Sequence, residues 1–330
     1  MAKFIITGGK QRTPGHDTVE WNGYDRAVSL IFDEQNLKAT PFFEYTSPAE
    51  HMPIEADASI TFKSASIKDK FLVISTSTEI MKVSLDSRKL DSIVSLPIFN
   101  DVHHAFINTN GNYIVTSTGL DAVFEVTDAG EVVNEWSASD SNIWEKFDDK
   151  IDYRKVLTTK PHPIHPNHCT EIEKEYWVTR FEKQDILNLC TRESISIPFG
   201  RPHDGLLADD SAYFTHVNGI ISKIDFSNRK VEELFDVNAI YSGKKSLGWC
   251  RGLCLTSDHE MILGFSRLRS TKYEDAIHWA KRLLTDSASY YGCKPTRLAK
   301  YDFKKNVLVW EFDLEPHDIN AVFSILPLPD

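Results

Sequence analysis

Two stretches of sequence decide the fold: HAFINTNGNYIVT at residues 104–116 and HDGLLADDSAYFT at residues 203–215. Each begins with a histidine, runs through apolar residues into a polar turn, and closes on a second apolar run that ends in threonine. The two stretches align without a gap, and the histidine precedes the threonine by 12 residues in both. Self-similarity of this kind predicts a repeating structural unit.

Further copies of this unit occur along the chain. Residues 168–179 have the same order of features with a turn one residue shorter, and residues 251–264 begin with arginine in place of histidine. His317 is preceded by proline and followed by aspartate, as His203 is, so the end of the chain matches the start of the unit. The histidines at matching positions are therefore His104, His168, His203 and His317.

A hairpin pattern accompanies these copies. Its clearest example is residues 123–133, where two alternating apolar segments flank the turn residues 127–130. Alternation with turn residues between the segments indicates half-buried antiparallel strands. Four such strands in a unit of roughly 40–45 residues, repeated around a channel, describe one blade of a β-propeller.

The repeats predict an all-β chain, a six-bladed β-propeller that forms a single domain over residues 1–330. The sixth blade combines an inner strand from the C-terminus with outer strands from the N-terminus, which ties the two ends together and removes exposed sheet edges. Two insertions, at about 139–166 and 269–295, are expected to cap the channel, the second as an amphipathic helix. The predicted blades are 58–97, 102–137, 167–199, 202–238, 250–314, and 320–326 joined with 4–7, 27–32 and 40–45.

Composition narrows the classes of function. The net charge of −11 argues against a general nucleic-acid binder, because attraction to phosphates needs clustered lysine and arginine. The sequence has no long apolar stretch and no apolar leader, and its five cysteines lack paired CxxC spacing. We therefore expect a cytoplasmic protein with reduced cysteines and no membrane partner, whose oligomeric state is unknown.

The four matching histidines predict a metal site. Residues at equivalent positions of a closed repeat point toward one axis, and neutral imidazoles bind first-row divalent metals. Four nitrogens leave positions open on a five- or six-coordinate ion, with Fe(II) favoured and Mn(II) possible, whereas they would close the tetrahedron of zinc. His103 competes with His104 for the position that faces the channel, because adjacent strand residues face opposite ways.

Arg251 takes the place of the histidine in the fifth blade. Its planar fork suits a carboxylate, sulfate or phosphate, so we expect it to anchor an acidic group of a small-molecule substrate. Arg251 and His103 are the candidate catalytic residues. Four acidic residues are candidates to orient the rings. Asp204 and Asp318 directly follow two of the histidines, and Asp101 and Glu171 lie near the others. The remaining histidines are read as loop or surface residues, with the exception that His165 can reach the rim.

One segment resembles a blade of the bacterial arylsulfotransferases, through HHAFINTNGNY at 103–113, DAVFEV at 121–126 and the Glu-Trp pair at 135–136. Those enzymes are six-bladed propellers that use channel histidines and an arginine. The resemblance implies His104, His168, His203 and His317 as catalytic imidazoles and Arg251 as an oxyanion clamp. This chain differs from them in showing no export signal and no separate N-terminal domain. It also resembles an uncharacterised bacterial propeller group, through GWCRG at 248–252 and GFSRLR at 264–269.

Three hypotheses for function follow. The first is a metal-dependent enzyme, with oxidation favoured over elimination, that acts on a small organic substrate carrying an acidic group. The second is a metal-free sulfuryl or phosphoryl transferase with a nucleophilic histidine. The third is a non-enzymatic ligand-binding propeller, in which the histidines only line a polar channel.

Overall fold

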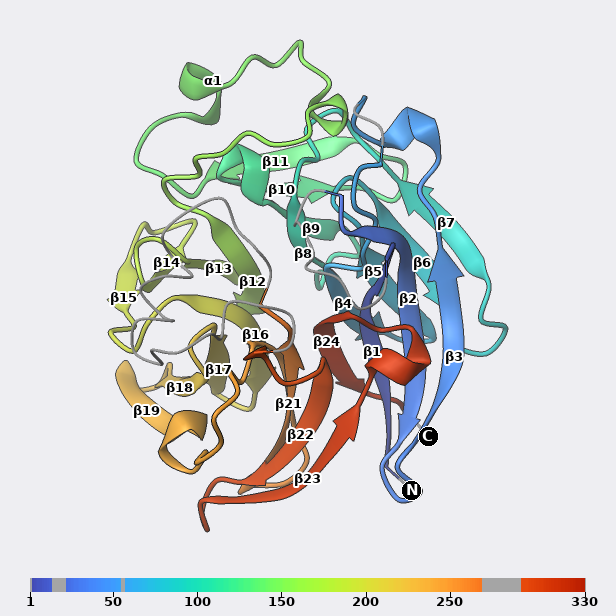
Figure 1. Cartoon of the computed structure of the whole chain (residues 1–330). Coiled ribbons are helices and arrows are strands. Elements are labelled where there is room, and N and C mark those ends of the chain that lie inside the picture. Colours follow the sequence, from blue (N-terminus) through green and yellow to red (C-terminus); the bar gives the residue numbers. More distant parts are fainter. Residues whose placement is uncertain (1, 14–21, 55–56, 269–291, 330) are drawn as a thin grey trace.

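The computed structural model describes residues 2–13, 22–54, 57–268 and 292–329. Its strands form six four-stranded antiparallel sheets arranged around a common axis, which are the blades of a β-propeller (Figure 1). The predicted all-β fold and its six blades are thereby confirmed.

Each blade runs outward from a strand at the axis. The innermost strands are β24 (Ala321–Pro327), β4 (Ser64–Lys68), β8 (Val102–Ile107), β12 (Pro166–Ile172), β16 (Pro202–Ala208) and β20 (Trp249–Leu255). The second strands are β1 (Lys3–Gln11), β5 (Phe71–Ser75), β9 (Tyr113–Ser117), β13 (Glu175–Arg180), β17 (Ser211–His216) and β21 (Glu260–Ser266). The third strands are β2 (Tyr24–Asp33), β6 (Ile80–Ser84), β10 (Ala122–Val126), β14 (Asp185–Asn188), β18 (Ile220–Asp225) and β22 (Arg297–Asp302). The outermost strands are β3 (Lys38–Tyr45), β7 (Leu90–Val94), β11 (Val132–Ser137), β15 (Ser194–Ser196), β19 (Lys230–Asp236) and β23 (Val307–Asp313).

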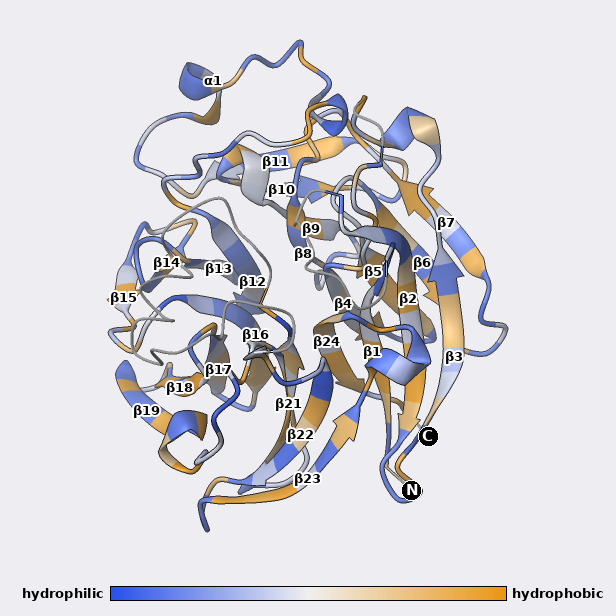
Figure 2. Ribbon diagram, viewed as in Figure 1, coloured by the Kyte–Doolittle hydropathy of each residue, from blue (hydrophilic) through white to orange (hydrophobic). Residues whose placement is uncertain are grey.

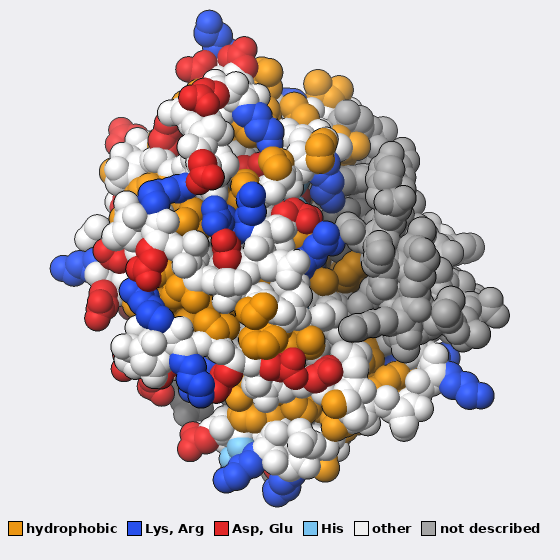
Figure 3. Space-filling view, turned by 90° about the vertical axis from the view of Figure 1, so that its left-hand side faces the viewer, with side chains coloured by type: hydrophobic (Ala, Val, Ile, Leu, Met, Phe, Trp, Pro, Cys, Tyr) orange, Lys and Arg blue, Asp and Glu red, His pale blue; other side chains and the backbone are white. Residues whose placement is uncertain are grey.

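Helices in the described residues are single turns. They are α1 (Ile143–Lys146) and the 3-10 turns η1 (Ala49–His51), η2 (Thr118–Leu120), η3 (Tyr153–Lys155), η4 (Val237–Ala239) and η7 (Glu315–His317). None of the helices in these ranges is long and apolar enough to cross a membrane. On the face seen in Figure 3, acidic and basic side chains are interspersed with apolar ones.

The two ends of the chain share one blade, as the sequence predicted. Strand β24 pairs antiparallel with β1, with Ile325 opposite Ile6 and Ser324 opposite Thr7. Gly8 permits this pairing, because a Cβ at that position would lie 1.9 Å from the carbonyl oxygen of Ala321. The N- and C-terminal strands therefore complete the ring together (Figure 1).

The hydrophobic core lies between neighbouring blades. One cluster joins Val73 of β5 to Val115 of β9 and Phe124 of β10, and another joins Ile6 of β1 to Ile262 of β21. Apolar stretches follow the strands in Figure 2. Each fully buried side chain of this size contributes about 1.5–3 kcal/mol, so this packing holds the blades at fixed angles around the axis.

The innermost strands of four successive blades bulge near their first residues. Pairing with the second strand skips after Val102, Pro166 and Pro202, and slightly later, after Arg251, in β20. In two of these bulges, the hydroxyl of the threonine that closes the sequence repeat accepts a hydrogen bond from a backbone amide of the innermost strand. Thr179 Oγ1, for example, accepts from the amide of His168 at 2.9 Å. A bulge re-aims the neighbouring side chains, so repeat register alone does not fix which ones face the axis.

The two predicted insertions differ in how far they are described. Residues 139–166 connect β11 to β12 and are described throughout. Most of the insertion predicted at 269–295, including its expected amphipathic helix, lies outside the described residues.

Candidate metal centre

Three histidines converge where the innermost strands begin. His103 comes from the bulge of β8, His203 from the bulge of β16, and His165 from the last turn of the 139–166 insertion, directly before β12. Each offers one ring nitrogen, and these nitrogens lie within 4.8 Å of one another. We call His103, His165 and His203 the rim triad.

Hydrogen bonds fix the tautomer of two members of the rim triad. His103 Nδ1 lies 2.8 Å from the carbonyl oxygen of Asp101, and His203 Nδ1 lies 3.1 Å from Asp204 Oδ1. A carbonyl or a carboxylate can only accept, so each Nδ1 carries the proton. The Nε2 of each ring is then left with a free lone pair, as a metal ligand requires.

A short relay fixes the third ring in the same way. Thr159 Oγ1 donates its one proton to the carbonyl oxygen of Gly119 at 2.5 Å, so it accepts from His162 Nε2 at 3.0 Å. His162 Nδ1 is then unprotonated and accepts from His165 Nδ1 at 3.3 Å. His165 is left with a lone pair on Nε2, like the other two members of the rim triad.

The rim triad is neutral near pH 7. Burial lowers the pKa of His103 to about 3, against the opposing charge of Asp101. Burial, together with the charge of Arg251, lowers the pKa of His203 to about 4. The pKa of His165 is likewise lowered by burial and by the neighbouring histidines. Neutral imidazole is the form that binds metal ions, so acid does not compete for these rings until the pH is well below neutral.

The spacing of the rim triad fits one metal ion after a small movement of the rings. Three nitrogens bound to one ion with bonds of about 2.1 Å lie roughly 3.0–3.6 Å apart, depending on the coordination geometry. From the observed limit of 4.8 Å, each ring nitrogen has to move inward by roughly 0.7–1 Å to share an ion. Phe181 packs beside the triad, with its ring centroid 5.0 Å from that of His165 and 5.9 Å from that of His203.

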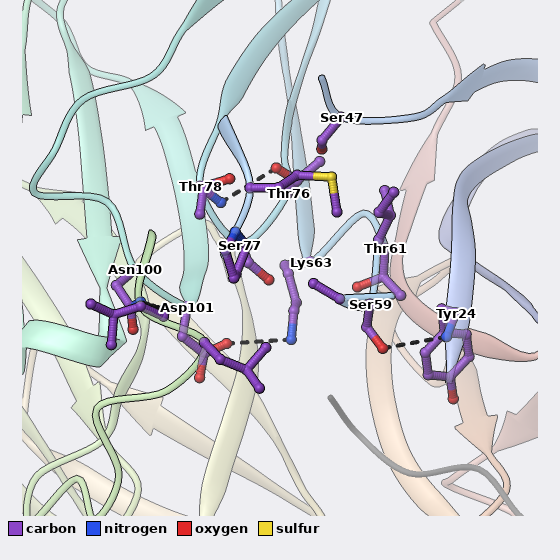
Figure 4. Close-up of a pocket in the computed structure, with 16 residues that line it drawn as sticks. Tyr24, Ser47, Ser59, Thr61, Lys63, Thr76, Ser77, Thr78, Asn100 and Asp101 are labelled. Atoms are coloured by element: carbon purple, nitrogen blue, oxygen red, sulfur yellow. Dashed lines mark hydrogen bonds and ion pairs between the residues drawn. The ribbon is translucent and has the colours of Figure 1, made fainter. Parts of the chain in front are cut away.

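Two ion pairs flank the rim triad. Asp204 Oδ2 lies 3.2 Å from Arg251 Nε and accepts from the amide of Gly252 at 2.9 Å. Although burial raises the pKa of Asp204, the charges of His203 and Arg251 outweigh that effect, and the net result is a lowered pKa. The second pair joins Lys63 Nζ to Asp101 Oδ1 at 3.4 Å, and the two side chains face each other in Figure 4.

Both cations of these ion pairs also contact one aromatic ring of β24. Lys63 Nζ lies 5.6 Å from the ring centroid of Phe323, and the guanidinium carbon of Arg251 lies 4.7 Å from it. Two cations at these distances from one ring are within the range of cation–π attraction. The predicted substrate anchor Arg251 is thus 7% exposed, paired with Asp204 and held beside the axis.

Two of the predicted metal ligands form a separate group deeper in the channel. The ring centroids of His104 and His168 are 4.1 Å apart, and both side chains line a channel cavity of about 390 Å³. We call them the channel pair. Burial lowers the pKa of His168 to about 4, and that of His104 also lies below its usual value. His104 Nδ1 is buried and has no hydrogen-bond partner in the described part of the chain.

His317 is not gathered with the other predicted ligands. It ends the turn η7 and stacks on Phe312, with ring centroids 5.2 Å apart and planes inclined by 18°. The innermost strand of this blade begins only at Ala321, after Asp318 in a left-handed conformation. Although the sequence around His317 resembles that around His203, β24 starts five residues later than the likeness to β16 implies.

Sequence reasoning gave less weight to two residues that the structure brings to the site. His165 was placed only within reach of the rim, because it lies outside the repeat. Lys63, which precedes β4, had no signal in the repeat pattern. Of the acidic residues expected to orient the rings, Asp204 accepts from His203 through Oδ1, and the carbonyl oxygen of Asp101 accepts from His103. The other two have different partners, since Asp318 pairs with Lys10 and Glu171 accepts from Thr109.

Comparisons with known proteins support the fold. No family model matches the chain, and no curated protein matches it. A solved structure of a protein of unknown function from Bacteroides caccae superposes with a TM-score of 0.62 at 13% identity, with 100% of each chain covered. A chain of a nidogen/laminin complex superposes with a TM-score of 0.53 at 10% identity, covering 98% of this chain and 97% of that chain. A streptogramin B lyase gives 0.50 at 12% identity, covering 94% and 88%. At these identities the likeness shows the propeller fold alone.

Proposed function

We propose that this protein is a metal-dependent enzyme whose divalent ion is held by His103, His165 and His203. The observation that carries the proposal is the hydrogen bonding of the rim triad. In each ring Nδ1 is committed to a partner, which leaves the lone pair of the neutral imidazole on Nε2. One ring nitrogen of each histidine lies within 4.8 Å of the others. Surface or purely structural histidines have no need of this shared arrangement.

The donor set defines the class of metal. Three imidazoles suit Fe(II) and Mn(II), the metals that the sequence favoured, and leave open positions on either ion. They also admit zinc, since three histidines leave the fourth tetrahedral position open. When bound, such an ion would activate a small molecule at its remaining positions as a Lewis acid or redox centre.

The surrounding charges support an acidic substrate. Lys63 and Arg251 are balanced by Asp101 and Asp204, so with neutral histidines the charges of these described residues sum to zero. A divalent ion adds two positive charges in a buried place, and an anionic group on the substrate compensates them. Arg251 and Lys63, which both lie over the ring of Phe323, would orient that anionic group through their positive charges. Oxidation of the substrate is the first reaction class to assay, and elimination is the second.

Elemental analysis of the purified protein tests the metal proposal. We expect about one equivalent of iron, manganese or zinc per chain and its loss in the His203→Ala variant. A wild-type protein that takes up none of the three metals after reconstitution would overturn the proposal. Aryl sulfates and phosphates would then be the next substrates, because residues 103–136 resemble a blade of the arylsulfotransferases, which act through a histidine.

A further inference from the structure

The central channel contains polar side chains that the metal proposal does not use. All six innermost strands line the cavity of about 390 Å³, a volume in the range of small-molecule sites. Its wall is mixed, with Phe106, Leu253 and Phe323 among the apolar side chains. The channel pair and Asn167 belong to its polar part, together with His103, Asp204, Lys68, Thr170 and the serines of β4 and β24 (Ser64, Ser66 and Ser324).

Among these polar groups, Asn167 has both polar atoms of its side chain buried without a partner in the described residues. Its side chain is only 1% exposed, and neither Oδ1 nor Nδ2 has a hydrogen-bond partner in the described part of the chain. A buried amide with both ends unpaired is costly, and such groups in folded proteins are usually satisfied by a partner outside the chain. Within the bulge of β12, Asn167 directly follows Pro166, as His203 directly follows Pro202 in β16.

The imidazoles beside Asn167 in the cavity wall are uncharged. His104 and His168 have lowered pKa values and carry no charge near pH 7. The carboxylate of the cavity wall, Asp204, already accepts from Gly252 and His203. The cation of the wall, Lys68, is the exposed last residue of β4, whereas Asn167 is the second residue of β12, so a ligand that pairs with Asn167 meets hydrogen-bonding groups and apolar surface first.

We propose that this channel site binds a neutral small molecule that presents adjacent N–H and C=O groups, as a primary amide, lactam or imide does. The side chain of Asn167 has the complementary edge, because Oδ1 accepts from the N–H and Nδ2 donates to the C=O. His104 Nδ1, which also lacks a partner in the described ranges, offers a further hydrogen bond from the same wall. The site goes beyond the metal proposal and does not depend on it.

Binding of three small probes to chelator-treated, full-length protein tests the proposal by titration calorimetry. Benzamide has the required edge, acetophenone replaces its N–H group by a methyl of similar size, and benzoate replaces the edge by a charge. We expect saturable binding of benzamide, about tenfold weaker binding of acetophenone, and still weaker binding of benzoate. Equal affinities for the three probes, or no saturable binding of benzamide, would overturn the proposal.

A matched pair of variants locates the site. Asn167→Leu keeps the approximate shape of the side chain and removes both hydrogen bonds, so it is expected to weaken benzamide binding at least tenfold. Asn110→Leu changes an exposed turn asparagine and is expected to leave it unchanged. Metal content should be the same in both variants. Unchanged benzamide binding in Asn167→Leu contradicts the assignment, and the wild-type probe series decides the matter even if that variant does not fold.

Discussion

The rim triad and the channel pair contain the same side chain in nearly the same place, yet their chemistry differs. His103 and His104 are adjacent in β8, and both are at least 90% buried. His103 donates through Nδ1 to a fixed carbonyl, whereas His104 Nδ1 has no partner within the described residues. In the proposed site, the hydrogen bonds around each imidazole, and not its place in the repeat, select the metal ligands.

Replacing ligands is expected to separate the two groups most strongly. His103→Ala or His203→Ala should weaken metal binding by at least about 100-fold, because losing a ligand costs more than losing an outer hydrogen bond. His104→Ala should change it by less than about threefold. Competition titration with a coloured chelator measures both constants. Comparable losses in the two groups would show that the division between rim triad and channel pair is false.

Removing the partner of His203 should have the next largest effect. Asp204→Ala frees His203 Nδ1 and removes the carboxylate paired with the buried guanidinium of Arg251, so stability should fall by about 3–5 kcal/mol and metal affinity by about 10–100-fold. Asp185→Ala is the control, because it breaks a similar pair with Arg180 elsewhere in the ring. Urea unfolding should show a loss in both variants, and metal titration a loss only in Asp204→Ala. If both variants keep wild-type metal affinity, Asp204 does not orient His203.

Changing Thr159, which accepts from His162 at the start of the relay to His165, should have a smaller effect on metal affinity. Thr159→Val removes the hydroxyl that accepts from His162 Nε2, so His162 can change tautomer and cease to hold His165. We expect about a tenfold loss of metal affinity with little change in stability. Thr158→Val, at an exposed neighbouring position, should change neither. Identical metal affinities in the two variants would show that Thr159 and His162 do not hold His165 for metal binding.

Acid should act on the channel pair through stability. The pKa of His168 is about 4 in the folded protein against 6.5 for an unperturbed histidine, so between these values the unfolded chain binds more protons. The free energy of unfolding of the metal-free protein should therefore fall as the pH drops from about 6.5 to 4. His168→Gln should reduce this slope by up to about 1.4 kcal/mol per pH unit. Urea unfolding at several pH values measures the slope. An unchanged slope would contradict a neutral, buried His168.

Much of the fold could be predicted from the sequence, because each blade of a propeller repeats the same pattern of strands and turns. The alternating hairpins and the closing threonines gave six blades and the shared terminal blade, which the structure confirms. The residues of the candidate site were harder to predict, because a bulge shifts by one residue which side chains of a strand face the axis. His165 lies in an insertion that no repeat describes, and the likeness around His317 lies before its strand begins.

The metal content of His165→Ala beside that of His317→Ala, after identical reconstitution with iron, manganese and zinc, distinguishes the two possible sets of ligands. The repeat alone selects His317 as a ligand, whereas the hydrogen bonding of the folded chain selects His165. We expect His165→Ala to lose the metal and His317→Ala to keep about one equivalent. Metal retained in His165→Ala and lost in His317→Ala would contradict this expectation.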